Sequence, residues 1–333
     1  MDDRYEEIFR QYDIKIHNTY RTRGAFILET NHGIKLCKNF EGSKNRVEFE
    51  NRILEHLRDA GYQYVDNYMY NINGEIVTED FRNNQYVIKN WYIGEECNLK
   101  ELKDVLKATN NLAVLHSKMR GILLTTEQIK YNTYNNLFEL FEKHNRELKR
   151  VRSYIRDKKV KNEFELCFSN FYDNFYEQGC KAIDILKQSA YGAMLEKANN
   201  LIHVCHGNYT YHNIIFLQDG AATTNFDKAS IGVQISDLYH FLRKVMEKNN
   251  WNIELGDKII EEYNKVITLS EDELEVLYVL LLYPEKFWKI TNYYYNGKKS
   301  WVPQKNIQKL INIGEQAEQK ELFLNHLKKF NVL

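Results

Sequence analysis

The sequence has little proline and no excess of charge of either sign. These two features argue against a disordered chain and against a strongly basic protein. Only two of the 333 residues are proline, and 46 lysines and arginines balance 46 aspartates and glutamates. Because 43% of the residues are apolar and 14% are aromatic, the combination excludes a disordered chain. The balanced charge also argues against a protein that binds nucleic acid through a basic surface. The length is enough for one large domain or two lobes with a buried core.

Long apolar runs and paired cysteines are lacking as well. No stretch of about eighteen apolar residues occurs, so we expect no membrane-spanning segment. The first residues are too acidic and polar for a signal peptide, so we expect synthesis in the cytoplasm. The five cysteines are scattered without a C-x-x-C pair, and they predict neither a disulfide framework nor a zinc site.

The first part of the chain has the pattern of a small sheet. A short amphipathic helix is expected near residues 2–12. Residues 14–93 then show short alternating runs separated by turn signals such as Asn73-Gly74, which are typical of antiparallel hairpins. One helix, expected over 44–60, interrupts these runs. The pattern predicts an antiparallel sheet with a single long helix.

The rest of the chain is mainly helical. Helical periodicity covers 99–200 and returns from residue 236 to the end, while short strands are expected over 205–216 and 222–226. The whole pattern predicts a bilobal α+β fold, with a small β-rich N-lobe and a large, mostly helical C-lobe. A cleft between two such lobes is where ligands usually bind. The predicted boundaries are 1–93 for the N-lobe and 94–333 for the C-lobe, with functional loops at 203–216 and 222–232.

Lys38 lies on the apolar face of an alternating run, together with Ile34 and Leu36. A lysine there must reach solvent or meet an anion, because burying an unpaired ammonium is costly. Glu50 lies on the inward face of the following helix, at helical spacing from Val47. We therefore predict that Lys38 pairs with Glu50, like the pair that holds nucleotide phosphates in kinase-like folds. The alternative is a strand-end lysine that reaches solvent.

A second pattern is more specific. Residues 206–213 read His-Gly-Asn-Tyr-Thr-Tyr-His-Asn and fit H-G-D-x-x-x-x-N with one change, and Asn225-Phe226-Asp227 follows the next short strand. In phosphotransferases with this motif, the loop aspartate accepts the proton of the substrate hydroxyl. The asparagine five positions on and an aspartate after the next strand bind Mg²⁺. The alternative, a plain polar loop, leaves the spacing of both motifs unexplained.

With these motifs, nearly the whole chain resembles the aminoglycoside/choline-kinase-like superfamily, and within it the CotS-like spore coat family. The resemblance extends to the hinge-like segment 86–97 and to 112–117, 236–238 and 283–292. It implies a protein-kinase-like fold of the aminoglycoside phosphotransferase type, synthesis in the mother-cell cytoplasm and deposition in the spore coat. It also implies ATP as cofactor, with nucleotide contacts at Lys38, Glu50, Val87, Lys89 and Trp91.

Two asparagines stand where the resemblance implies aspartates. Asn208 takes the position of the catalytic base, and Asn225 takes that of the metal-binding residue. An amide has no useful basicity, and losing two carboxylates removes two negative charges from a Mg²⁺ site. We therefore expect weak Mg²⁺ binding through Asn213, Asn225 and, if the loop re-routes, Asp227. His206 is expected to hold the loop through a backbone hydrogen bond rather than act as a base.

The sequence thus predicts a CotS-like pseudokinase with a kinase-derived nucleotide cleft, which acts in spore coat assembly with other coat proteins and binds neither nucleic acid nor membrane. The alternative is an active ATP-dependent phosphotransferase on a small-molecule hydroxyl or a coat protein, with Asp227 on the metal and Lys38 on the phosphates. A third interpretation is a sensor that closes on a nucleotide without turnover. Asp237 is expected to brace the catalytic-type loop or to cap a helix.

Overall fold

The structure is a computed structural model that describes residues 3–22, 24–132, 136–297 and 304–330. The chain forms two compact units. Unit 1 consists of residues 1–133 and 198–237, and unit 2 of residues 134–197 and 238–333. The predicted boundary between residues 93 and 94 separates lobes rather than these units, and it stays a prediction.

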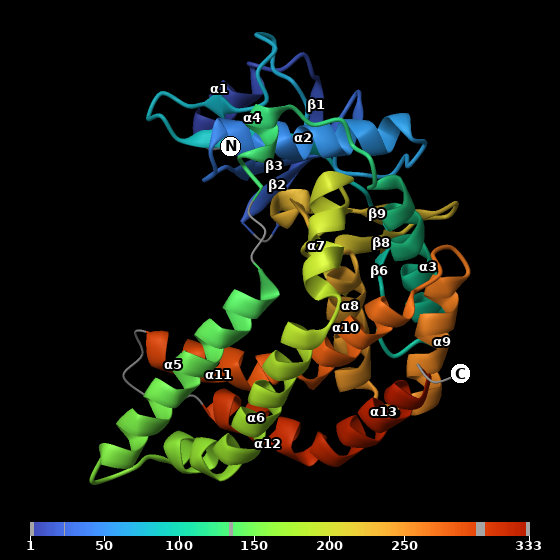
Figure 1. Cartoon of the computed structure of the whole chain (residues 1–333). Coiled ribbons are helices and arrows are strands. Elements are labelled where there is room, and N and C mark those ends of the chain that lie inside the picture. The colour runs from blue at the N-terminus through green and yellow to red at the C-terminus, as the bar shows by residue number, and fades with distance from the viewer. Residues whose placement is uncertain (1–2, 23, 133–135, 298–303, 331–333) are drawn as a thin grey trace. The chain divides into compact units, whose positions relative to one another are not determined.

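The first half of unit 1 is an antiparallel sheet with helices. Its strands pair in the order β1-β2-β3-β5-β4. Figure 1 draws its first three strands, with α1 and α2, in the blue N-terminal part of the chain. This confirms the predicted sheet with one long helix. The elements are α1 (Asp3–Phe9), β1 (Ile16–Thr22), β2 (Ala25–Thr30), β3 (Gly33–Asn39), α2 (Lys44–Asp59), β4 (Thr78–Glu79), β5 (Gln85–Asn90), β6 (Glu95–Glu96), α3 (Leu102–Lys118) and α4 (Thr126–Ile129).

Local sequence signals fix both ends of α2. The Ser43 side chain caps the helix by accepting a hydrogen bond from the Arg46 backbone N–H, which satisfies one of the free donors of the first turn. Gly61 follows the helix with φ of +79°, a conformation that glycine adopts without strain. The helix buries a stripe of side chains that includes Glu50. The helix is therefore anchored with a carboxylate on its inward face.

The two faces of the sheet have different partners. On one face, Leu28, Cys37 and Ile88 pack with Ile8 and Phe9 of α1 in a hydrophobic cluster. Successive residues of a strand point to opposite faces. The opposite face therefore carries Lys38 and Leu36 of β3, which pair in register with Val87 and Lys89 of β5. Two lysines from neighbouring strands thus share the face that does not carry the α1 cluster.

The second half of unit 1 consists of short strands and 3-10 turns. A three-stranded sheet has the order β6-β8-β9, and β7 pairs with β10. The predicted strand over 222–226 is shorter than expected, because the chain turns at Asn225, which has a left-handed φ of 65°. Asparagine tolerates this conformation better than most residues. The elements are β7 (Val204–Cys205), η1 (Tyr211–Asn213), β8 (Ile214–Phe216), β9 (Ala221–Thr223), η2 (Phe226–Lys228) and β10 (Ser230–Ile231).

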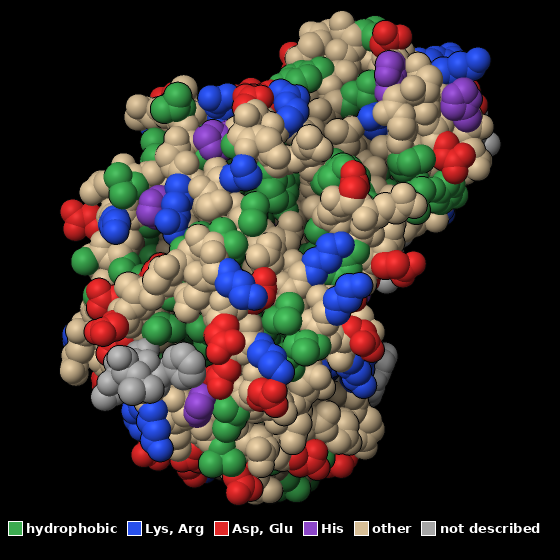
Figure 2. Space-filling model, turned by 90° about the vertical axis from the view of Figure 1, so that its right-hand side faces the viewer, with side chains coloured by type: hydrophobic (Ala, Val, Ile, Leu, Met, Phe, Trp, Pro, Cys, Tyr) green, Lys and Arg blue, Asp and Glu red, His purple; other side chains and the backbone are tan. Residues whose placement is uncertain are grey.

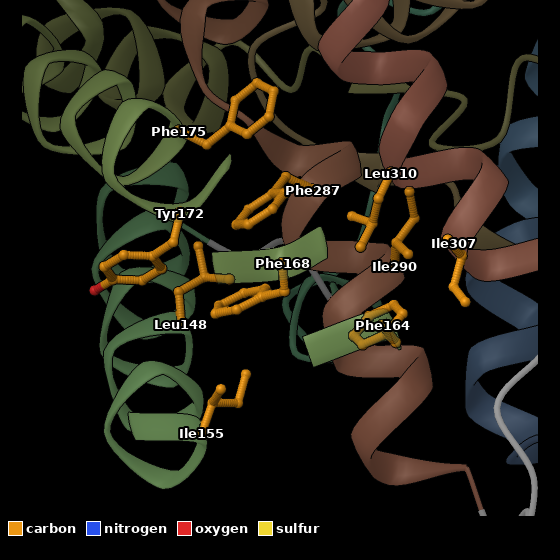
Figure 3. Close-up of a cluster of buried hydrophobic side chains, with 10 residues drawn as sticks. All are labelled: Leu148, Ile155, Phe164, Phe168, Tyr172, Phe175, Phe287, Ile290, Ile307 and Leu310. Carbon is orange, nitrogen blue, oxygen red and sulfur yellow. The ribbon is translucent and has the colours of Figure 1, made fainter. Parts of the chain in front are cut away.

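Unit 2 is built from helices around an aromatic core (Figure 3). Phe287 stacks on Phe168 and on Phe175, with ring centroids 5.1 and 4.9 Å apart. This core joins α5, α6, α11 and α12. The helices are α5 (Leu137–Asp157), α6 (Glu163–Gln188), α7 (Tyr191–Asn200), α8 (Ile235–Lys248), α9 (Ile253–Asn264), α10 (Glu271–Leu282), α11 (Glu285–Asn296), α12 (Gln304–Glu315) and α13 (Ala317–Phe330), of which α7 and α8 extend into unit 1.

The charges on the surface and the apolar content of the helices agree with the composition of the sequence. On the face drawn in Figure 2, acidic and basic side chains are interspersed, as expected for a chain of zero formal net charge. Among the described residues, none of the helices is long and apolar enough to cross a membrane.

Candidate functional site

The predicted site residues all belong to unit 1, where Asp237 anchors the catalytic-type loop. The Asp237 carboxylate accepts backbone hydrogen bonds from His206 at 2.6 Å and Gly207 at 2.9 Å, and it lies 3.1 Å from Nε2 of His116. Burial opposes charge on Asp237, but these hydrogen bonds outweigh burial and lower the pKa of the carboxyl group. Asp237 therefore braces the loop as an anion.

Gly207 is the position where the loop passes close to other backbone. Its φ is +73°, and an added Cβ would lie 2.2 Å from the carbonyl oxygen of Lys228. Only glycine fits such an approach without moving the chain. The catalytic-type loop is therefore fixed against the metal-type loop by backbone packing.

His206 uses both of its ring nitrogens within the protein. Nδ1 accepts the backbone N–H of Asn208 at 3.1 Å, and Nε2 lies 3.1 Å from the carbonyl oxygen of Thr224. A carbonyl only accepts, so the proton of the neutral ring is on Nε2. Burial lowers the pKa of His206 and favours this neutral form. The structure therefore gives His206 the backbone hydrogen bond that the sequence analysis expected and leaves it no lone pair for a substrate proton.

A chain of amides replaces the expected catalytic and metal ligands. Nδ2 of Asn213 donates to the backbone carbonyl of Asn208 at 2.8 Å, and Nδ2 of Asn225 donates to Oδ1 of Asn213 at 2.9 Å. Because a carbonyl oxygen can only accept, the first bond fixes which end of the Asn213 amide points to Asn225. Asn225 must then present its NH₂ group to the Asn213 oxygen. The oxygen that would ligate Mg²⁺ thus already accepts a hydrogen bond from a protein donor.

This arrangement does not fit a Mg²⁺ ion. Mg²⁺ sites depend on one or two carboxylates in octahedral geometry. Asp227 is exposed in the 3-10 turn η2, off the end of the strand, and it does not take the place of Asn225. Its backbone carbonyl accepts a hydrogen bond from Arg46 at 3.1 Å. Within the described ranges, no group of three His, Cys, Asp or Glu side chains could hold a metal ion.

The prediction that Lys38 pairs with Glu50 is wrong, because Lys89 occupies that carboxylate. Nζ of Lys89 lies 2.6 Å from Oε1 of Glu50 and 3.1 Å from Oδ2 of Asp66, and it sits 4.1 Å from the ring centroid of Tyr68. Lys89, Glu50 and Asp66 are only 1, 3 and 1% exposed. The strand pattern placed Lys38 on the correct face, but it could not show that Lys89 of the paired strand lies on that face too.

The buried site contains two carboxyl groups, of Glu50 and Asp66, but only the one ammonium of Lys89 among these three residues. Burial raises the pKa of Glu50, but the charge of Lys89 outweighs it, so that the pKa of Glu50 is lowered overall. Burial and the charge of Glu50 raise the pKa of Asp66, although Lys89 opposes them. Glu50 is therefore the carboxylate that balances Lys89. The Oδ1 atom of Asp66 is buried and has no hydrogen-bond partner among the described residues.

Asp66 is the residue of this site that the sequence analysis missed. Its Oδ2 also accepts the backbone N–H of Asn225 at 3.0 Å, and the neighbouring Val65 bridges to Thr223 of β9. An acid thus stands beside the position where a metal-binding aspartate was expected, but it binds Lys89 and the backbone. In the sequence, Asp66 is a single aspartate among tyrosines and a valine, and no recognisable motif surrounds it.

The remaining predicted residues lie along β5 and β3. Val87 is fully buried opposite Lys38, and Trp91 follows the strand and is partly exposed. The ammonium of Lys89 is paired with the carboxylates of Glu50 and Asp66, so it is not available to a nucleotide. Lys38 is partly exposed, and no hydrogen bond or ion pair occupies its ammonium within the described part of the chain. Its charge nevertheless helps to lower the pKa of Glu50.

The two lysines give a matched test of the ion pairing. Lys89→Met should lower the free energy of unfolding by about 3–5 kcal/mol, because it leaves a buried carboxylate without its cation. Lys38→Met should change it by less than about 0.5 kcal/mol. Urea unfolding of both variants measures this difference. Glu50→Gln added to Lys89→Met should recover part of the loss, and an equal cost for the two single variants would contradict the assignment.

The amide chain predicts a metal response for one substitution. Asn225→Asp would place a carboxylate oxygen against the fixed Asn213 oxygen and should lower stability in EDTA by about 1–3 kcal/mol. Mg²⁺ should restore part of this loss, because a cation between the two oxygens removes their repulsion. Thermal unfolding with and without Mg²⁺ measures both effects, and Asn225→Ala is the control that should show no metal response. An Asn225→Asp protein indifferent to Mg²⁺ would refute this reading of the geometry.

The chain is similar over most of its length to known proteins. Residues 5–327 match the family model described as "Spore coat putative kinase YutH". Spore coat protein S of Bacillus subtilis (strain 168) is 23% identical over 307 residues, which cover 92% of this chain and 87% of that protein.

Solved structures with the same fold are phosphotransferases and kinases. An aminoglycoside phosphotransferase from Alicyclobacillus acidocaldarius has a TM-score of 0.84 and 17% identity, and the match covers 97% of this chain and 94% of that one. A spectinomycin phosphotransferase with ADP and spectinomycin has a TM-score of 0.65, 12% identity and coverage of 95 and 97%. A microcompartment-associated aminopropanol kinase has a TM-score of 0.63, 12% identity and coverage of 97% of each chain.

At these identities the solved structures show the fold alone, and they confirm the predicted kinase-like fold of the aminoglycoside phosphotransferase type. The match of the family model over nearly the whole sequence confirms the predicted relation to spore coat proteins. The chain belongs to the family of spore coat kinase-like proteins described as "Spore coat putative kinase YutH".

Proposed function

We propose that the chain is a spore coat pseudokinase, which keeps a kinase-derived nucleotide site but does not transfer phosphate. It acts through assembly with other coat proteins after synthesis in the mother-cell cytoplasm. Membership of the spore coat family supports the place of action. The hydrogen bond from Asn225 to Asn213 carries the proposal of inactivity, since it directs a protein N–H donor, in place of a carboxylate, at the oxygen that would ligate the metal.

The absence of a catalytic base at position 208 would lower the rate of phosphate transfer further than a weakened metal site alone. A general base contributes about 10²–10⁴-fold to such reactions, and the Asn208 amide cannot take up a proton near neutral pH. His206 does not replace it, because its accepting nitrogen is bonded to the Asn208 backbone. Phosphoryl transfer depends mainly on positioning and on neutralising the charge of the phosphates. Without a held metal, that neutralisation would fall to Lys38 alone.

The nucleotide part of the proposal depends on Lys38. Lys38 is partly exposed, on the same face of the sheet as Val87, and its ammonium has no hydrogen bond or ion pair within the described part of the chain. The related folds named above include a spectinomycin phosphotransferase with ADP bound. We infer that ATP binds to the face of Lys38 and Val87, with Trp91 at its margin, and that binding requires no Mg²⁺.

A binding assay separates this function from that of an active kinase. ATP should raise the melting temperature equally in EDTA and in Mg²⁺, and Lys38→Met should abolish the increase while leaving the unliganded protein intact. With radiolabelled ATP, no label should reach sugars, amines or coat proteins. Robust Mg²⁺-dependent transfer that disappears in Asp227→Ala would overturn the pseudokinase and establish the active phosphotransferase. Absence of any ATP response would contradict the nucleotide site.

A further inference from the structure

Unit 2 contains a buried cluster of charges that the proposed function does not use. Arg243 of α8 is 7% exposed, and its Nη1 atom lies 2.6 Å from Oε1 of Glu247. Its Nη2 atom lies 3.9 Å from Glu285, and Lys286 lies 2.9 Å from the other oxygen of Glu247. The Nε–H group of Arg243 is buried and has no hydrogen-bond partner among the described residues. Leaving such a donor unpaired is costly, so an acceptor is expected beside it.

A second cation, Lys320 of α13, lines the same cavity as Arg243. Lys320 of α13 donates a long hydrogen bond of 3.4 Å to the carbonyl of Leu282, and its Nζ atom lies 5.7 Å from the ring centroid of Trp251. Burial of the amino group and the nearby charge of Arg243 lower the pKa of Lys320 to about 8. An ammonium with one long hydrogen bond retains donors for a further ligand.

Arg243 and Lys320 line one cavity. Its volume is about 40 Å³, and its other walls include Phe175, Tyr283 and Gln316. A single water needs about 10–15 Å³ of such volume, so the cavity has room for a few waters or one small ion. A larger cavity of about 270 Å³ shares Phe175 and Lys320 as walls. The small cavity therefore has three cationic side chains in its lining, Arg243, Lys286 and Lys320, and it shares two walls with a larger cavity.

The cavity is lined by charges of both signs. Three cations, Arg243, Lys286 and Lys320, line it together with two carboxylates, Glu247 and Glu285. Lys289, which lies 2.6 Å from Glu285, further neutralises one of these acids. Because the side chains of Lys286 and Lys289 are 31 and 50% exposed, solvent screens their charges. The feature that favours an anion is the pair of unused donors on Arg243 and Lys320.

We propose that this cavity is a binding site for a small oxyanion, a carboxylate or phosphate group, held by Nε of Arg243 and Nζ of Lys320. The oxygens of such a group accept hydrogen bonds from both donors at once, and the paired charges make those bonds strong. The group is either a free ion or the anionic end of a small molecule whose remainder extends into the larger cavity. The site lies wholly within unit 2 and does not depend on the proposed function.

Calorimetry and thermal unfolding of the full chain, at constant ionic strength in sodium chloride, test the proposal. Inorganic phosphate or acetate should bind and raise the melting temperature, whereas neutral acetamide should not. Lys320→Met should weaken phosphate binding at least about tenfold, since a hydrogen bond to a charged group contributes that much or more. The control Lys329→Met changes an exposed lysine of the same helix and should bind like the wild type.

Two further measurements complete the test. Glycerol phosphate should bind more tightly than inorganic phosphate if the ligand extends into the larger cavity, and equally if the ion is free. A crystal soaked in selenate should show anomalous density between Arg243 and Lys320, a readout that needs no variant. Equal phosphate binding by wild type and Lys320→Met, or selenate density only at surface lysines, would overturn the site.

Discussion

The buried ammonium of Lys89 is the interaction on which the functional part of unit 1 depends. It joins three segments that are distant in sequence, because Lys89 lies on β5, Glu50 on α2 and Asp66 in the connection before β4. Asp66 in turn accepts the backbone N–H of Asn225. A charge out of water is tolerated only with good partners, so these segments must keep their places. The sheet, the helix and the metal-type loop are thereby connected through side chains of the protein.

The same chain of contacts links the two loops through donors and acceptors of the protein itself. In a phosphotransferase, Mg²⁺ neutralises and bridges the groups around it. Here Oδ1 of Asn213 accepts from the Asn225 amide, and Oδ2 of the neighbouring Asp66 accepts from Lys89. Asn208 and Asn225 are therefore linked through Asn213, which donates to the Asn208 carbonyl and accepts from the Asn225 amide. An aspartate at 225 would conflict with the orientation of Asn213 that the Asn208 carbonyl imposes.

Much of the fold follows from local signals, whereas the charge network does not. The cap at Ser43 and the glycine at 61 mark the ends of α2, and the alternating runs within residues 14–93 predicted the antiparallel sheet. The spacing from His206 to Asn213 predicted a catalytic-type loop, and this stretch folds as a loop that ends in the short turn η1. The partner of Glu50 could not be predicted from β3 alone, because it depends on the register between two strands. Asp66 and the cluster around Arg243 required contacts between residues far apart in the sequence, which no local pattern encodes.

The state of the Asn213 oxygen in the presence of nucleotide tests the central claim most directly. The measurement is a crystal structure of the chain grown with ATP and Mg²⁺. We predict nucleotide beside Lys38, the hydrogen bond from Asn225 to Asn213 unchanged at about 2.9 Å, and no metal bound to either side chain. A Mg²⁺ ion at about 2.0–2.1 Å from the Asn213 oxygen and from a carboxylate of Asp66 or Asp227 would contradict the account.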